Sequence, residues 1–371
     1  MRSSPSSVRL AGKRFPSVTT WRVSVALCTY NGARYVPEQL ESIASQTRLP
    51  YEMVVCDDRS TDNTVDIVQA FASHAPFPVR VFVNDRTLGS TKNFEQAIQL
   101  CEGDLIALSD QDDVWRPRKL ERMVAAFAAS PGVGAVFTDG EVVDDRLRPL
   151  GYRLWEAAGF GPSRRERFEH GQAVEVLLEN DVVTGATLAF RRDFLKAILP
   201  IPAIWVHDAW ITLLIAALGR VAIIDEPLVL YRHHSRQQIG VVQRPRSSGL
   251  AWVRSSLADV LMNINGYVVK GDEEYSMYAD QYKLACERLA AVLDPSDRRI
   301  LSRCRAKAEH FRARADMSNR RWMRFPMVMK ELLGLRYHRY SSGNKGLAKD
   351  LVRAALFWTP SISPTSRVRT L

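Results

Sequence analysis

Short β-type runs alternate with amphipathic helical patterns from Trp21 to Asp110, and no other feature constrains the fold of this chain as strongly. The expected strands comprise residues 22–28, 51–56, 79–83 and 104–109. Helical patterns separate them, at residues 37–46, 62–74 and 91–101. Strands that alternate with helices form a mostly parallel sheet with helices packed on its faces. The sequence therefore predicts an α/β fold, in which ligands bind at the carboxyl ends of the strands.

The character of the chain changes after about residue 240. Before this point, further strands are expected at residues 132–139, 183–190 and 220–230; after it, long helical patterns run over residues 272–293 and 296–315. Residues 1–20 carry charge, Ser and Pro but no apolar segment, which favours a disordered leader over a signal peptide. We therefore expect a leader (1–20), an α/β domain (21–243) and a helical C-terminal region (244–371).

The formal net charge of +10 favours an anionic partner, but it does not choose among nucleotide phosphates, nucleic acid and an acidic membrane surface. The five cysteines are scattered without CxxC spacing, so they indicate neither a disulfide framework nor a zinc site. The most apolar stretch, residues 211–224, is interrupted by Arg220 and is too short to span a bilayer. These features predict a cytoplasmic protein without a transmembrane helix.

Three carboxylates follow the strand expected at residues 104–109. Asp110 and Asp112 are two apart, so in an extended chain they project to one side, while Asp113 points elsewhere. Two such carboxylates repel each other unless a cation lies between them, and Mg²⁺ or Mn²⁺, completed by substrate phosphates, suits the pair. The alternative is that Asp112 or Asp113 caps the helix that begins near Pro117.

Polar residues also follow the first two strands. Tyr30 and Asn31 come after the first strand, and Asp57 and Asp58 end the second. Because parallel strands end at the same edge of a sheet, these side chains are expected on one rim with the carboxylates. Helix capping by Asp58 and Ser60, and simple packing of Tyr30, are the alternatives.

Four motifs carry a resemblance to a known family. The segments "VALCTYNG", "VVCDDRSTDNT", "NDRTLGSTKNF" and "LSDQDDVW", in this order, resemble the nucleotide-binding half of family 2 glycosyltransferases, which have the GT-A fold. The resemblance extends over about residues 22–240. One departure is Arg59, which stands where the family usually has Gly, so the turn must accept a side chain.

The resemblance implies roles for the rim residues. Tyr30, with its neighbour Asn31, would border the donor nucleotide, and Tyr30 would lie against its base. Asp58 would hydrogen-bond the imide edge of the base, and Asp110 would contact the ribose region. Asp112 would hold Mg²⁺ or Mn²⁺ on the diphosphate.

Lys92, in "LGSTKNF", could place a positive charge near the phosphates; the alternative is a solvated lysine at a helix end. In "YRHHSRQQIG", the resemblance makes Arg232 a candidate partner of the diphosphate and His234 a candidate metal or phosphate ligand. A solvated basic loop is the alternative for both.

Asp208, in "HDAW", lies where the family places the general base of an inverting transfer, in a motif more often written Glu-Asp. The change to His207 is similar to the rhamnosyltransferase-like branch. The alternative for Asp208 is a helix N-cap. Residues 184–190 resemble the segment that borders the donor sugar and acceptor; an ordinary strand with a Gly kink is equally compatible.

The resemblance thus implies a metal-dependent inverting glycosyltransferase that uses dTDP-L-rhamnose or a UDP-sugar to extend a surface polysaccharide or lipid-linked glycan. The basic, apolar C-terminal helices would either lie on the inner face of an anionic membrane or pack on the catalytic domain. A glycoside hydrolase with a carboxylate pair is the alternative enzyme. Nucleic-acid binding is disfavoured, because the expected ligand rim is acidic whereas phosphate backbones need clustered Lys and Arg.

Overall fold

The computed structural model describes residues 21–234, 237, 264–294, 297–318, 323–341 and 343–356. Two compact units divide the chain: Met1–Arg246 with Gln281–Arg305, and Ser247–Asp280 with Ala306–Leu371. Residues 281–305 thus group with the first unit, although the sequence placed the boundary near residue 244. The expected leader, residues 1–20, lies outside the described residues.

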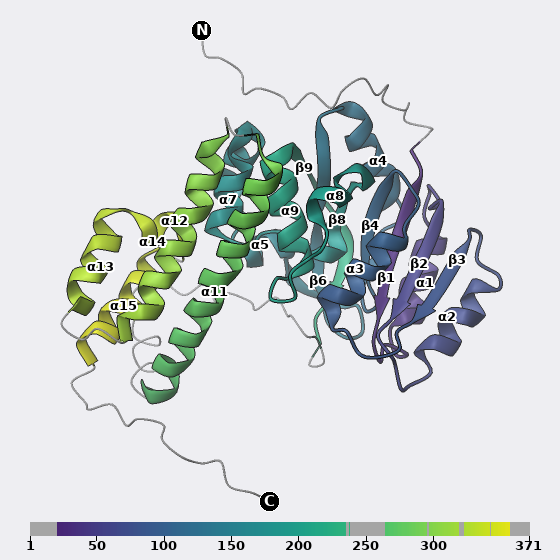
Figure 1. The fold of residues 1–371 in the computed structure, drawn as a ribbon. Coiled ribbons are helices and arrows are strands. Elements are labelled where there is room, and N and C mark those ends of the chain that lie inside the picture. The colour runs from purple at the N-terminus through teal and green to yellow at the C-terminus, as the bar shows by residue number, and fades with distance from the viewer. Residues whose placement is uncertain are drawn as a thin grey trace, which may run out of the picture. The chain divides into compact units, whose positions relative to one another are not determined.

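A nine-stranded sheet forms the centre of the first unit, in the order β3-β2-β1-β4-β8-β6-β9-β5, with β7 paired to β6 (Figure 1). Its strands are β1 (Val23–Thr29), β2 (Glu52–Asp57), β3 (Val79–Val83), β4 (Leu105–Asp110), β5 (Val114–Trp115), β6 (Val133–Val143), β7 (Pro149–Arg153), β8 (Leu188–Arg191) and β9 (Arg220–Arg232). Strands β3, β2, β1 and β4 pair with one another in parallel, as predicted. Antiparallel pairing begins at β8, between β4 and β6.

The expectation of one strand over residues 183–190 was wrong in its first half. Gly185–Thr187 forms a 3₁₀ turn, η2, and only Leu188–Arg191 is a strand. The reason is local, because the Thr187 N–H donates to the Thr184 carbonyl at 2.9 Å and the Gly185 N–H donates to a side chain, that of Asp208. Neither N–H is therefore available to a sheet ladder.

Helices cover both faces of the sheet, which explains why β1 is buried along its whole length. Val25 and Leu27 pack in one apolar cluster with α1 (Val36–Ala44), α2 (Thr64–Ala72) and α4 (Lys119–Ala129). Ala26 and Cys28 point the opposite way, into a cluster with α3 (Ser90–Leu100), α7 (Ala173–Glu179) and α9 (His207–Leu218). The apolar side chains of β1 therefore alternate between two hydrophobic cores. This unit also contains the short helices α5 (Leu154–Ala158), α6 (Pro162–Arg167) and α8 (Leu195–Ile198).

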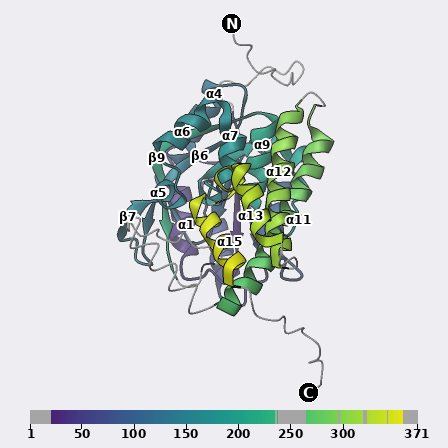
Figure 2. The ribbon, with the colours of Figure 1, turned by 90° about the vertical axis from the view of Figure 1, so that its left-hand side faces the viewer.

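Helices alone make up the described part of the second unit, in agreement with the helical C-terminal region that the sequence predicts (Figure 2). They are α11 (Ile264–Val292), α12 (Arg298–Ala315), α13 (Arg324–Leu333), α14 (Arg336–Tyr340) and α15 (Asn344–Leu356), and the boundary between the units falls within α11 and α12. Its interior contains a buried ion pair, in which Arg314 Nε donates to Asp350 at 2.7 Å. No helix in the described ranges is long and apolar enough to cross a membrane.

Candidate functional site

The loops after β1 and β2 are fastened to each other by side chains. The Asp57 carboxylate accepts hydrogen bonds from the hydroxyls of Thr29 (2.7 Å) and Ser60 (2.6 Å). Asn31 accepts from the Thr61 N–H at 2.8 Å, and its own N–H donates to Ser60 Oγ at 2.8 Å. Asn31 has a positive φ of 48°, a conformation that Asn tolerates better than most residues. These contacts fix the positions of the two strand ends.

Asp58 is buried, and its carboxylate holds the loop that precedes α3. It accepts hydrogen bonds from the N–H groups of Leu88 (2.7 Å) and Gly89 (2.9 Å) and from the Asn84 amide (2.9 Å). The predicted contact of Asp58 with a nucleotide base stays a prediction. The next residue, Arg59, has a φ of 67°, so the turn accepts its side chain in the left-handed region that usually favours Gly.

Gln111 links the ends of β1 and β4, a role that the sequence analysis missed. Its side-chain amide accepts from the Tyr30 N–H (2.8 Å) and donates to the Tyr30 carbonyl (3.0 Å). A Cβ at Gly32 would lie 2.0 Å from Gln111 Oε1, so a glycine is needed there for this contact. The Tyr30 side chain itself is 44% exposed at the rim. The only signal in the sequence was a glutamine set between two carboxylates.

The carboxylates after β4 lie close enough to perturb one another. Burial, helped by the charges of Asp112 and Asp208, raises the pKa of Asp110 to about 7. Asp113 is fully buried; its Oδ1 accepts from the Arg232 N–H at 2.9 Å, and its Oδ2 has no hydrogen-bond partner among the described residues. Burial, with the charges of Asp112 and Asp110, raises its pKa well above the usual range. The folded protein thus holds Asp110, Asp112 and Asp113 close enough to repel one another when they are ionised.

Lys119 is the buried cation beside these carboxylates, and the sequence analysis did not single it out. Its Nζ donates to the Ala186 carbonyl at 2.6 Å and lies 3.3 Å from the ring centroid of Trp115. Burial lowers the pKa of Lys119 well below its usual value, while the charges of Asp113 and Asp110 act in the opposite direction. Lys119 therefore connects the start of α4 to η2, and it lies beside the carboxylates of Asp110 and Asp113.

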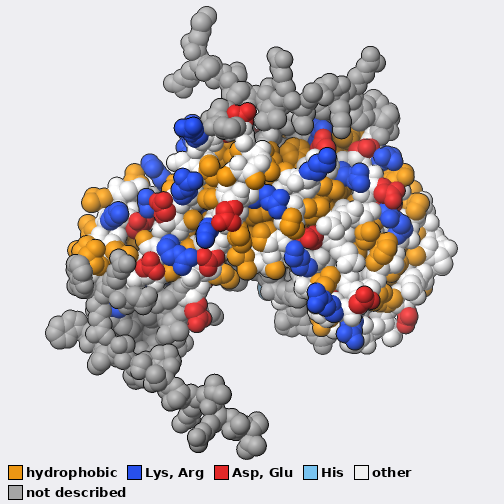
Figure 3. Space-filling view, in the orientation of Figure 1, with side chains coloured by type: hydrophobic (Ala, Val, Ile, Leu, Met, Phe, Trp, Pro, Cys, Tyr) orange, Lys and Arg blue, Asp and Glu red, His pale blue; other side chains and the backbone are white. Residues whose placement is uncertain are grey.

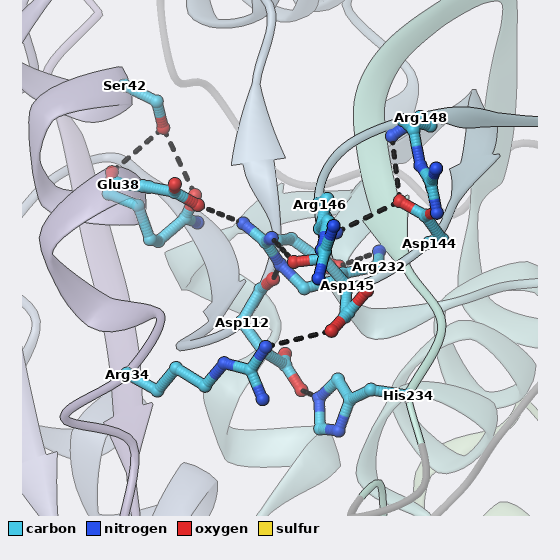
Figure 4. Close-up of polar contacts among 12 residues, drawn as sticks. Arg34, Glu38, Ser42, Asp112, Asp144, Asp145, Arg146, Arg148, Arg232 and His234 are labelled. Carbon is cyan, nitrogen blue, oxygen red and sulfur yellow. Dashed lines mark hydrogen bonds and ion pairs between the residues drawn. The ribbon is translucent and has the colours of Figure 1, made fainter.

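The two residues predicted as metal ligands lie together. His234 Nε2 is 2.9 Å from Asp112 Oδ2 (Figure 4). The His234 ring also packs on Tyr35, with centroids 4.8 Å apart. Among the described residues, no three His, Cys, Asp or Glu side chains are grouped to hold a metal ion by themselves. The pair nevertheless fits a hard cation, because Mg²⁺ sites commonly combine one or two protein ligands with substrate phosphates.

Arg232 is 1% exposed, and its guanidinium is used within the protein. Its Nε donates to the Asp112 carbonyl (2.7 Å), its Nη1 donates to the Asp145 carbonyl (2.7 Å), and its Nη2 donates to the Glu38 carboxylate (Figure 4). In the structure the guanidinium thus braces the backbone of Asp112 and Asp145, and its predicted contact with a diphosphate stays a prediction.

The loop before α9 is held by α3. Lys92 forms an ion pair with Glu95 at 2.8 Å and is 33% exposed, and the Glu95 carboxylate also accepts from the Ile201 N–H at 2.6 Å. The Thr91 hydroxyl donates to the Trp205 carbonyl at 2.7 Å. Lys92 thus lies in the first turn of α3, paired but accessible.

Asp208 is the second residue of α9 and is buried. Its Oδ2 accepts from the Gly185 N–H and its Oδ1 from the Ala209 N–H, each at 2.7 Å. Burial raises the pKa of Asp208 to about 6, although these two hydrogen bonds act in the opposite direction. Its charge contributes to the raised pKa of Asp110, so the carboxylates of α9 and β4 share one environment. The structure therefore brings Asp110, Asp112, His234 and Asp208 to the carboxyl end of β4 and its surroundings.

Residues 24–199 match the family model described as glycosyl transferase family 2. This part of the chain is therefore a glycosyl transferase family 2 domain. An uncharacterized glycosyltransferase of Nostoc sp. is 30% identical to this chain over 222 residues, which are 57% of this chain and 65% of that protein. The dTDP-rhamnosyl transferase RfbG of Shigella flexneri is 28% identical over 228 residues, 58% of this chain and 73% of that protein.

A likeness to a solved structure confirms the predicted fold. The crystal structure of residues 1–349 of Staphylococcus aureus TarS, in complex with UDP-GlcNAc, matches with a TM-score of 0.53 at 17% identity, and covers 90% of this chain and 89% of that chain. The α/β fold of GT-A type with a helical C-terminal region is thus shared. The chain spans 65% and 59% of the lengths of the first two curated relatives that it matches.

Replacement of the buried lysine should destabilise the protein. We expect Lys119→Met to lower the free energy of unfolding by about 2 kcal/mol, because it leaves the buried Ala186 carbonyl without its donor. Urea denaturation followed by circular dichroism measures this. The matched control is Lys92→Met, at an accessible ion pair, which should cost about 1 kcal/mol or less. Equal losses in the two variants would contradict the role given to Lys119.

Proposed function

We propose that this protein transfers a sugar from a nucleoside diphosphate sugar to a hydroxyl group of a glycan or lipid-linked acceptor, with inversion at the anomeric carbon. The observation that carries the proposal is the pairing of Asp112 with His234 near a buried carboxylate of raised pKa, Asp208, in a chain with a family 2 domain. The family 2 domain also disfavours the hydrolase alternative.

The donor end of the site would lie along β1, β2 and β4. The exposed ring of Tyr30 offers a stacking surface for a base, and Asn31 and Asp58 fix the loops around it.

Asp112 and His234 would hold Mg²⁺ or Mn²⁺, which when bound neutralises charge on the leaving diphosphate. Arg232 would act through Asp112, as a positioning residue, by donating to its carbonyl. Lys92, in the first turn of α3, would face the phosphates, and Lys92→Met should then weaken nucleotide binding.

Asp208 would accept the proton of the acceptor hydroxyl as its oxygen bonds to the anomeric carbon. The bond from that carbon to the diphosphate oxygen breaks on the opposite face, and the nucleotide leaves with the electron pair. A base with a pKa of about 6 suits this step, because at neutral pH it is mostly ionised yet binds a proton more readily than an ordinary Asp.

Two observations support dTDP-L-rhamnose, with UDP-sugars as the other donors. RfbG, which is 28% identical, is named as a dTDP-rhamnosyl transferase. The "HDAW" sequence at the start of α9 also resembles the rhamnosyltransferase-like branch. TarS, whose fold is shared, was solved with UDP-GlcNAc, which supports a nucleotide sugar in general.

The second unit is proposed to contact an anionic membrane. Phe325, Leu333 and Leu335 are 61%, 79% and 51% exposed. The only acidic residue in the range 323–341 is Glu331, and this carboxylate is buried against His310. Over the described part of the face drawn in Figure 3, basic and acidic side chains are interspersed, so the net charge of +10 is not concentrated there.

Vesicle sedimentation tests the membrane contact. The protein should pellet with phosphatidylglycerol vesicles more than with phosphatidylcholine vesicles, and Phe325→Ser with Leu333→Ser should reduce this binding because apolar insertion is lost. The control is Leu150→Ser, at a 40% exposed leucine of the first unit. An equal effect of the control, or no binding by the parent protein, would contradict the proposal.

Loss of the Asp112 carboxylate should weaken the cation site. In the presence of dTDP or UDP, Asp112→Asn should raise the dissociation constant for Mn²⁺ by roughly tenfold or more, because one of two protein ligands is lost. Electron paramagnetic resonance of free Mn²⁺ measures this constant. The control is Asp145→Asn, a partly exposed carboxylate that is ion-paired with Arg34 at 2.8 Å. Unchanged Mn²⁺ affinity in Asp112→Asn would remove Asp112 from the site.

Asp208 gives a prediction in rate and in pH. Asp208→Asn should keep nucleotide binding and lose sugar transfer by a factor on the order of 10² or more, because an amide cannot accept the proton. In the parent protein, kcat/KM should fall as the pH drops through about 6, since the base works only when ionised and its pKa is raised to about 6. Titratable groups near it include Asp110, His207 and Tyr231. Transfer by Asp208→Asn at the parent rate would refute the assignment.

A further inference from the structure

Two buried histidines in this protein differ in their hydrogen bonding. The imidazole of His310 is fully buried and has two partners, with Nδ1 2.6 Å from Glu331 Oε2 and Nε2 3.3 Å from Ser341 Oγ. The imidazole of His207 is 5% exposed, and neither of its ring nitrogens has a hydrogen-bond partner within the described residues. A buried polar group without a hydrogen-bond partner destabilises the folded protein. Its presence therefore indicates a role other than stability.

Packing alone does not explain a histidine at position 207. The ring stacks on Phe94, with centroids 3.9 Å apart and planes at 19°. A phenylalanine could make the same stack without two unsatisfied nitrogens. Burial also lowers the pKa of His207 to about 3, so the ring is neutral and offers one donor and one acceptor rather than a charge.

Gly185 lies against both the His207 ring and the Asp208 carboxylate. A Cβ at position 185 would lie 2.9 Å from His207 Nε2 and 3.5 Å from Asp208 Oδ2. Any other residue at this position would therefore crowd both the imidazole nitrogen and the carboxylate of the proposed base. The Gly185 N–H donates to Asp208 Oδ2 at 2.7 Å, so the glycine, the imidazole and the carboxylate form one small surface.

We propose that His207 is a binding residue for the donor sugar, with Nε2 hydrogen-bonded to a sugar hydroxyl that lies against Gly185. The inference rests on the proposed function, in which the anomeric carbon lies between the diphosphate at Asp112 and the base Asp208. The donor sugar must then occupy the space beside Asp208, next to Gly185 and the His207 ring. The bound sugar supplies the hydrogen-bond partner that His207 lacks among the described residues.

Stability measurements separate this role from a structural one. His207→Phe keeps a flat ring against Phe94 and removes the unsatisfied nitrogens, so its unfolding temperature should equal or exceed that of the parent protein. His310→Phe is the matched control and should lower the unfolding temperature, because the buried Glu331 loses its 2.6 Å partner and keeps only the contact with Arg336 at 3.3 Å. A comparable loss in His207→Phe would show that the ring is structurally required and would overturn the proposal.

Calorimetric binding then tests the ligand. The probes are dTDP and dTDP-L-rhamnose, and UDP and UDP-GlcNAc, each with Mn²⁺. For whichever pair the parent protein binds, His207→Phe should leave the affinity for the nucleotide unchanged and should weaken binding of the nucleotide sugar by roughly three- to tenfold, the usual effect of one lost hydrogen bond. His207→Gln, which keeps a polar group at the end of its side chain, should recover part of the loss.

The outcomes are distinguishable from failure of the proposed function. If the parent protein binds none of these nucleotides, the proposed function fails. If the parent protein binds them and His207→Phe binds nucleotide and nucleotide sugar with parent affinities, the function stands and the assignment of His207 to the donor sugar is wrong. Slower transfer with unchanged donor affinity would likewise overturn it and would move the residue to the acceptor side.

Discussion

The burial of several carboxylates at the end of one strand is the constraint on which the rest of the site depends. Asp113 and Asp208 are buried and Asp110 is half-buried. Burial raises the pKa of all three, and repulsion by neighbouring carboxylates adds to this for Asp110 and Asp113. Lys119 is fully buried beside them, and the charges of Asp113 and Asp110 favour its protonated form against the effect of burial. Such an arrangement costs stability, and it is retained where a function needs concentrated negative charge.

Around these carboxylates, several side chains form hydrogen bonds with the backbone of a neighbouring loop. Gln111 bonds to the backbone of Tyr30, Asp58 accepts from two N–H groups of the loop before α3, and Arg232 donates to the carbonyl of Asp112. Each contact ties a loop at one strand end to another loop at the same edge. A site built in this way can place an aromatic ring, a cation and a base in fixed positions before any ligand binds, which favours catalysis.

The strands could be predicted from the sequence because their apolar runs are short, regular and bounded by turns, as in β1 and β4. The segment 183–190 could not, because its 3₁₀ turn depends on Asp208, 23 residues away. The importance of Lys119 and Gln111 was also invisible, since it depends on the Ala186 carbonyl and on the missing side chain of Gly32. Asp112 and His234 could be singled out from sequence motifs. The enclosure of Arg232 by Glu38 and Asp145 could be seen only in the folded structure.

The central claim is that a divalent cation held by Asp112 and His234 binds the diphosphate of a nucleotide. Isothermal titration of the unaltered protein with dTDP and with UDP, first with Mn²⁺ and then with EDTA, tests this claim most directly. The account predicts binding of at least one nucleotide that is strong with Mn²⁺ and is weakened by EDTA. Binding that is equally strong with EDTA would contradict the role of the cation, and no binding under either condition would contradict the donor site itself.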